Sequence, residues 1–128
     1  MQVGGVPSRI ISCGNTQQLY DAAIELWGSD EKFHVLAGGS NTVFAEDLAD
    51  LTIVHVTNRG VEIVSEDAQF VTVRVQAGHS WDEFVAWSVA NDYAGMEAMS
   101  GIPGSVGATP VQNVGGYGQE VSDVITQI

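Results

Sequence analysis

Residues 100–118, SGIPGSVGATPVQNVGGYG, constrain the fold more than any other part of this sequence. They contain six glycines, two prolines and no charged side chain. A flexible linker has a similar glycine content, but linkers rarely carry several large apolar residues. Such residues occur throughout this segment, at Ile102, Val106, Val111, Val114 and Tyr117. We therefore expect the segment to form a ligand cradle. The alternative is a long glycine-rich surface loop.

The same segment contains groups that suit an uncharged mode of binding. The stretch PGSVGAT predicts a short helical turn that begins near Ser105, with free backbone N–H groups aimed outward. Gln112 and Asn113 are adjacent amides, each with donors and an acceptor, that can bind the edge of a flat heteroaromatic ring. The segment therefore favours a ligand held by dipoles rather than by charges.

The charge balance excludes one large class of partner. The chain has sixteen Asp and Glu against four Lys and Arg, which gives a formal net charge of -12. Binding to a nucleic-acid backbone requires clustered cations, so no nucleic-acid partner is expected. A bound phosphate would have to be held mainly by backbone N–H groups. For most of the acidic residues, keeping the surface soluble is the simpler role.

A second glycine turn follows an apolar run. FHVLA at 33–37 predicts a buried strand, and GGSN breaks it. Gly38 and Gly39 allow a positive φ and a close approach by a ligand, while Ser40 and Asn41 add side-chain donors. The alternative is an ordinary tight turn.

The rest of the sequence predicts mixed helices and strands. Ser80 and Glu83 have the spacing of a helix capping box. A length of 128 residues fits one domain or one lobe of a larger protein, and the abrupt ends predict a piece of a longer chain. We find neither a secretory leader nor an apolar run of the ~20 residues that span a bilayer, so no membrane partner is expected. Helices are predicted at 15–28 and 80–91, and strands at 33–37, 51–56, 61–64 and 70–77.

Few side chains indicate other chemistry. Cys13 is the sole cysteine, which rules out an intrachain disulfide and favours a reducing cytoplasm. It is predicted to be a small buried apolar group. His34 and His55 lie in strand patterns and are predicted to be core or edge residues. His79 is predicted to be a turn residue, with contact to a ligand as the alternative. The three histidines lack metal-ligand spacing, so no metal is expected.

Three stretches resemble one known family in order and spacing. LAGGSN, VQAGHSWDEFVAW and YAGMEAMSGIPGSVGATPVQNVGGYGQEVSDVI occur in this order in the UDP-N-acetylenolpyruvoylglucosamine reductases, and QVGG at 2–5 matches that family's opening turn. The resemblance runs from about Val3 to Ile128. It implies an α+β FAD-binding domain of the vanillyl-alcohol oxidase or PCMH type. Two small α+β subdomains would span about 1–57 and 58–128, with the substrate-binding domain absent.

The resemblance also implies a function. The family consists of bacterial cytoplasmic flavoenzymes of peptidoglycan synthesis. They hold FAD non-covalently and use NADPH to reduce UDP-N-acetylenolpyruvoylglucosamine, the UDP-sugar substrate, to UDP-N-acetylmuramate. The family's catalytic residues would lie beyond residue 128, so this chain should contain none and be inactive alone. His79 in AGHSW resembles a covalent attachment site of other members of the fold, a role this family does not use. The alternatives are another flavin oxidoreductase of the fold and a non-catalytic module without a cofactor.

The resemblance assigns cofactor-binding roles by motif. Gly116 stands where the family more often has alanine, which should only loosen the backbone. Tyr117 matches a tyrosine near the flavin and the substrate. Residues expected near the flavin are Gln112, Asn113 and Gly115. Residues expected near the FAD pyrophosphate are Gly38, Gly39, Ser40, Asn41, Ala77, Gly78, Ser100, Gly101, Ile102, Pro103, Gly104, Ser105, Gly107 and Ala108.

Overall fold

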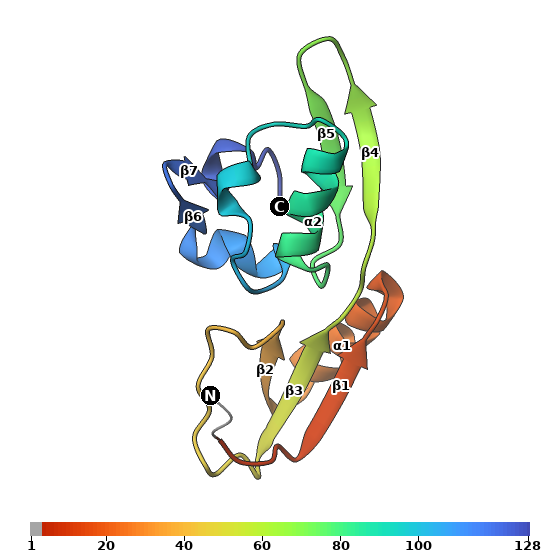
Figure 1. The fold of residues 1–128 in the computed structure, drawn as a ribbon. Helices are drawn as coiled ribbons and strands as arrows, with labels where there is room; N and C mark the ends of the chain where they lie inside the picture. Colours follow the sequence, from red (N-terminus) through yellow and green to blue (C-terminus); the bar gives the residue numbers. More distant parts are fainter. Residues whose placement is uncertain (1–3) are drawn as a thin grey trace. The chain divides into compact units, whose positions relative to one another are not determined.

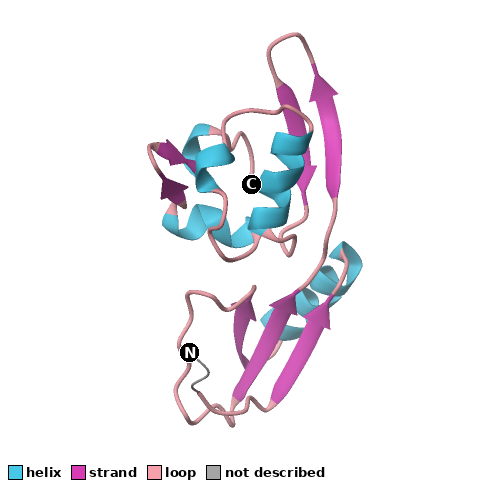
Figure 2. Ribbon diagram, viewed as in Figure 1, coloured by secondary structure: helices cyan, strands magenta, loops and turns pink. Residues whose placement is uncertain are grey.

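The computed structural model describes residues 4–128, which divide into two compact units, one ending at Asn58 and one beginning at Arg59. Figure 1 draws both units. Helices and strands occur in each, so the predicted mixed α and β content is confirmed (Figure 2). Gln2 and Val3 of the QVGG match lie outside the described residues. Within residues 4–128, every helix is too short or too polar to span a bilayer.

The first unit is built on a parallel sheet. Its strands are β1 (Arg9–Cys13), β2 (Lys32–Leu36) and β3 (Leu51–Val56), with β3 in the centre. The helix α1 (Thr16–Trp27) follows β1. The Asn15 side chain caps α1, because its Oδ1 accepts a hydrogen bond from the Gln18 N–H at 2.9 Å. The predicted helix and the two predicted strands of this unit are confirmed within a residue or two at each end.

One face of this sheet packs against α1. Four residues form the buried cluster, and Ile11, Leu19 and Phe33 pack around it. Trp27, at the end of α1, is 73% exposed, and its ring meets that of Phe33 edge-on. His34 lies on the edge strand β2 with its ring against Phe44, as expected of an edge residue. The buried cluster is Cys13, Ala22, Leu26 and Val54.

The second unit contains less regular structure. An antiparallel hairpin of β4 (Val61–Glu66) and β5 (Val71–Val75) leads into the helix α2 (Trp81–Ala90). Short elements lie within and on either side of the glycine-rich segment: η1 (Glu97–Met99), η2 (Val106–Gln112), β6 (Gly115–Gly116), β7 (Gln119–Glu120) and η3 (Val121–Asp123). The segment is therefore folded onto the unit rather than being an extended linker.

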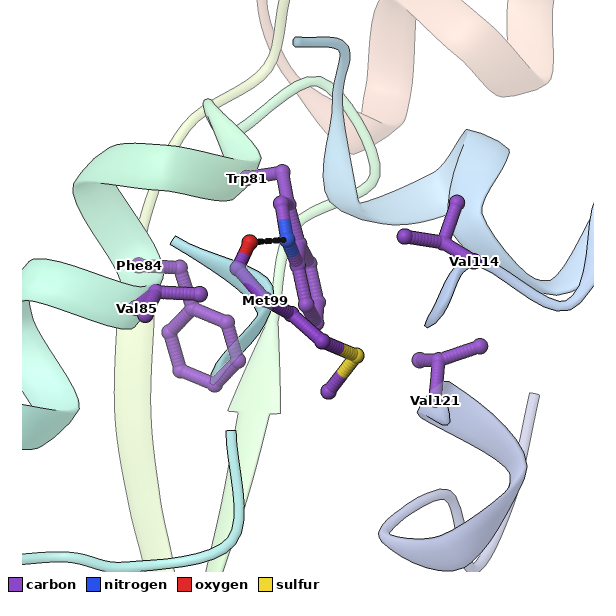
Figure 3. Close-up of a cluster of buried hydrophobic side chains, with 6 residues drawn as sticks. All are labelled: Trp81, Phe84, Val85, Met99, Val114 and Val121. Carbon is purple, nitrogen blue, oxygen red and sulfur yellow. Dashed lines mark hydrogen bonds between the residues drawn. The ribbon is translucent and has the colours of Figure 1, made fainter. Parts of the chain in front are cut away.

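The core of the second unit joins α2 to this segment. Figure 3 shows Trp81, Phe84 and Val85 of α2 beside Met99, Val114 and Val121. The Trp81 Nε1–H donates to the Met99 backbone oxygen at 3.0 Å, which satisfies the buried indole (Figure 3). Val89 of α2 is 52% exposed and is not part of this core.

The predicted capping box of α2 is only half formed. Ser80 Oγ accepts from the Glu83 N–H at 3.4 Å, as predicted. The Glu83 carboxylate, however, accepts from the Arg59 guanidinium at 2.9 Å. Glu83 is therefore paired with Arg59, which lies just before β4, a contact that local sequence spacing does not reveal.

Candidate functional site

The GGSN turn lies at the carboxyl edge of the parallel sheet, directly after β2. The segments that follow β1 and β3 reach the same edge, where the Thr57 N–H donates to the Cys13 oxygen at 2.9 Å. Ligands of open parallel sheets commonly bind outside the carboxyl ends of the strands. The sequence did not reveal that these strands are parallel, so Gly14 and Thr57 were not expected beside this turn.

Gly39 gives this turn an open surface. Its φ is +71°, a conformation that side-chain-bearing residues rarely adopt. A Cβ at this position would meet only Leu36 Cδ1, at 3.9 Å. The glycine is therefore required by its backbone conformation rather than by packing, and the space above it is open to a ligand.

In the second unit, two loops separated in sequence are bonded side by side. The Gly107 N–H donates to the Ala77 oxygen at 2.8 Å, and the Val106 N–H donates to the His79 oxygen at 2.9 Å. The Trp81 N–H donates to the Gly104 oxygen at 3.1 Å. These bonds join residues 77–82 to residues 99–107, and we call the two segments the paired loops. They bring together the candidates Ala77 and Gly78 and those at 100–108.

One sequence expectation for this region is wrong. The turn that begins at Ser105 exists, as η2, but its first N–H groups do not point outward. Those of Val106 and Gly107 donate to the carbonyls of His79 and Ala77. A Cβ on Gly107 would lie 2.6 Å from the Ala77 Cβ, so this glycine is required by the close approach of the two loops.

The paired loops retain donors that nothing in the described part of the chain accepts. The backbone N–H groups of Ile102, Gly104 and Ser105 have no acceptor among residues 4–128. The buried Ser105 Oγ and His79 Nδ1 likewise lack a partner there. Buried polar atoms nearly always have a hydrogen-bond partner, so the Ser105 and His79 side chains fit contact with a bound ligand. The free N–H groups beside them can donate to oxygens of the same ligand. Gly101 lies beside them with a φ of +77°, and a Cβ on it would meet no described atom within 4 Å.

Asp82, which was not among the residues predicted from the sequence, accepts hydrogen bonds from two groups that were expected to bind the ligand. Its Oδ1 accepts from the Ser100 hydroxyl at 3.0 Å and from the Gly101 N–H at 2.6 Å. The Gly101 N–H, followed by the Ser100 hydroxyl, lowers the pKa of this carboxyl below its usual value. Acidic residues are common in the first turn of a helix because they interact favourably with the helix dipole. The contact of Asp82 with Ser100 and Gly101 was therefore not apparent from the sequence.

The expected flavin-side residues differ in what their side chains do. The Asn113 amide is bonded at both ends, since Nδ2 donates to Glu120 at 2.7 Å and Oδ1 accepts from the Ser122 N–H at 3.1 Å. Its φ of 47° places it in the left-handed region at the end of η2. Gln112 is exposed at the last position of η2. Gly115 packs against the Gln119 oxygen, which would lie 2.9 Å from a Cβ.

Tyr117 forms the tip of the β6–β7 hairpin. It is 99% exposed and has a φ of +52°, and Gly118 follows with a φ of +87°. Holding a tyrosine in the left-handed region costs roughly 1–2 kcal/mol. The hairpin is anchored where the Ala98 N–H donates to Gln119 Oε1 at 2.8 Å. A strained, fully exposed aromatic ring on an anchored turn is suited to contact with a ligand.

The basic side chains are already paired with acids. In the described residues, the ion pairs are Arg9 with Glu25, Lys32 with Asp50, Arg59 with Glu83 and Arg74 with Glu62. Residues 4–128 also contain no group of three or more His, Cys, Asp or Glu arranged to hold a metal. A bound diphosphate would therefore be met here mainly by backbone and hydroxyl dipoles.

Comparisons with known proteins agree with this chemistry. A family model described as "FAD binding domain" matches residues 7–128. The chain is 45% identical over 128 residues to a UDP-N-acetylenolpyruvoylglucosamine reductase of Salinispora arenicola, covering all of this chain and 35% of that protein. The reductase of Mycolicibacterium smegmatis is also 45% identical, with 100% and 34% covered. That of Leifsonia xyli is 44% identical over 125 residues, with 98% and 33% covered. The chain spans about a third of the length of these relatives.

Proposed function

The chain belongs to the family of FAD-binding domains, and we propose that it binds FAD non-covalently, with backbone donors of the paired loops in the second unit on the diphosphate. The turn 38–41 of the first unit is a separate candidate for contact with the phosphates of FAD, and it is tested separately below. The observation that carries this proposal is the set of unpartnered donors at Ile102, Gly104 and Ser105 in a chain whose cations are paired. Oriented N–H dipoles of this kind bind phosphate oxygens without a cation.

The cofactor-binding roles of individual residues divide by their geometry. We assign the diphosphate to the backbone N–H groups of Ile102, Gly104 and Ser105, which have no acceptor among residues 4–128. Gly39, which has open space above it, is the candidate contact in the first unit. We assign Gly107 and the Asn113 side chain to holding the loops in shape, because their bonds and contacts lie within the protein. Tyr117, exposed at its hairpin tip, is assigned to the flavin or the substrate.

The intact protein is proposed to reduce UDP-N-acetylenolpyruvoylglucosamine to UDP-N-acetylmuramate, with NADPH as the reductant, as a cytoplasmic enzyme of peptidoglycan synthesis. The names of the relatives, at about 45% identity over this whole chain, support this proposal. Bound FAD would supply hydride-transfer chemistry, and the present residues would bind and orient it. The catalytic groups are proposed to lie outside residues 1–128, so this chain alone should not turn over the substrate.

FAD titration of the 128-residue chain, followed by flavin fluorescence, tests the proposed binding. Saturable binding is expected, and Gly39→Asp should abolish it by placing a carboxylate against the phosphates. Gly28→Asp is the matched control, because it introduces the same carboxylate at the end of α1 that lies away from the carboxyl edge of the sheet. Binding that survives Gly39→Asp would refute the placement of the diphosphate at this turn. Reduction of the UDP-sugar by the isolated chain would refute the proposal that the catalytic groups lie outside residues 1–128.

A further inference from the structure

The carboxylate of Asp82 holds the middle of the loop that is proposed to face the diphosphate. It accepts from Ser100 Oγ at 3.0 Å and from the Gly101 N–H at 2.6 Å with a single oxygen, Oδ1. A phosphate oxygen would have to displace this carboxylate to use the same two donors. Ser100 and Gly101 are therefore turned toward α2, and the donors that remain for a ligand are the next ones along the chain.

Those remaining donors depend on how this loop is held. Trp81 fixes its two ends, since its indole N–H donates to the Met99 oxygen at 3.0 Å and its backbone N–H donates to the Gly104 oxygen at 3.1 Å. Between these ends, Gly101 has a φ of +77° with open space around it, so its own packing does not restrain it. Glycine without side-chain contacts has many accessible conformations. Asp82 supplies the restraint between the two ends.

We propose that Asp82 is a positioning residue that holds Ser100 and Gly101 so that the N–H groups of Ile102, Gly104 and Ser105 stay directed at the diphosphate of FAD. This inference rests on the proposed function. Asp82 does not contact the cofactor in this account. It reduces the ordering that the loop must undergo when FAD binds, and preorganisation of this kind increases affinity.

FAD titrations of wild type, Asp82→Ala and Asp82→Asn test the proposal. Asp82→Ala removes both hydrogen bonds and should raise the Kd for FAD about tenfold, the size expected from losing one or two net hydrogen bonds. Asp82→Asn keeps an oxygen that can accept both bonds and should raise the Kd only about threefold, since a neutral acceptor bonds more weakly. Rescue by asparagine separates the loop contact from any effect of the negative charge on the phosphates.

Asp67→Ala is the matched control within the same unit. Asp67 Oδ1 accepts from the N–H groups of Gln69 and Phe70 in the β4–β5 turn, at 2.8 Å each, so the control also removes two bonds from an exposed turn. A general loss of stability would affect both variants, whereas the positioning role predicts a Kd within about twofold of wild type for Asp67→Ala.

The outcomes distinguish this inference from the proposed function. Asp82→Ala that binds FAD as tightly as wild type, or more tightly, overturns the positioning role and leaves FAD binding intact. Should Asp82→Ala fail to fold, Asp82→Asn decides, and an unchanged or lowered Kd overturns the role. A wild-type chain that does not bind FAD overturns the proposed function itself.

Discussion

The two units position their glycine-rich regions by different physical means. In the first unit, the GGSN turn follows a strand of a parallel sheet, and the regular ladder of β1, β3 and β2 determines where the turn lies. In the second unit, the glycine-rich loop has no ladder of comparable length. Individual bonds from 77–82 and the packing of Trp81 and Met99 hold it in place.

This difference predicts which region is more sensitive to single substitutions. A turn at a sheet edge shares the stability of many backbone hydrogen bonds, so no single side chain determines its position. A loop held by a few contacts depends on each of them, and Trp81 provides two. We therefore expect single substitutions to disturb the glycine-rich loop of the second unit more than the turn of the first.

The largest expected effect is that of Trp81→Ala. The ring is almost fully buried and its Nε1–H is bonded, so the substitution leaves a cavity and an unpaired carbonyl. It should lower the free energy of unfolding by about 3–5 kcal/mol, compared with about 2–5 kcal/mol for Leu26→Ala in the core of the first unit. Urea denaturation measures both variants.

Trp27→Ala is the control for Trp81→Ala, because it removes the same side chain from an exposed site. We expect it to cost about 1 kcal/mol or less. If Trp27→Ala were as costly as Trp81→Ala, the contrast between a regular first unit and a second unit anchored by Trp81 would be incorrect.

A smaller effect is expected from Gly107→Ala, which overpacks the paired loops. The new methyl group would lie 2.6 Å from the Ala77 Cβ and 3.1 Å from the Ala77 oxygen. We expect destabilisation of about 1–3 kcal/mol. Because the closest contact is with a methyl group, adding Ala77→Gly should recover part of the loss, and thermal unfolding of the four proteins in this cycle measures the coupling. Strictly additive losses would contradict the close packing of these two loops.

The smallest expected effect is the pH dependence of stability, which should differ in sign between the units. Backbone N–H groups lower the pKa values of Asp67, Asp82 and Glu97, all in the second unit. The stability that these carboxylates contribute is present above their usual pKa of about 4. It is lost as the pH falls through their lowered pKa values in the folded state. Burial raises the pKa of the Cys13 thiol in the first unit. Its contribution is present below the usual thiol pKa of about 8.5 and is lost as the pH rises.

Amide hydrogen exchange across a pH series resolves these two trends by unit, after correction for the intrinsic exchange rate. Protection in the second unit should weaken first on acidification, and protection around Cys13 should weaken first in alkali. The effects should be small because all three acids are exposed and salt screens them. Equal acid sensitivity of the two units would contradict the assignment.

The sequence predicted helices α1 and α2 and strands β2 to β5, but it missed strand β1 and the contacts between loops. Helix α1 and strand β3 follow from local periodicity and from Asn15 as a cap, which depend on neighbouring residues only. The end of β4 was missed because the pairing shifts between Ile63 and Ser65, which disturbs the alternation.

The candidate site was predictable only as far as its motifs. Positive φ at Gly39 and Gly101 follows from their being glycines in turns. The bonding of Val106 and Gly107 to residues 77–79 was not predictable, because it joins backbone groups almost thirty residues apart. Asp82 was missed for the same reason, since its partners are defined by the tertiary fold rather than by the sequence around it.

The central claim is that the backbone donors of Ile102, Gly104 and Ser105 in the second unit bind the diphosphate of FAD. Backbone amide chemical shifts of the ¹⁵N-labelled chain, recorded while FAD is added, test it most directly. Large shifts are expected at Gly101, Ile102, Gly104 and Ser105, with little change at 67–70 in the β4–β5 turn. Shifts at Gly39 and Ser40 test the turn of the first unit separately. Amides of Ile102, Gly104 and Ser105 that do not shift while FAD binds would contradict the claim.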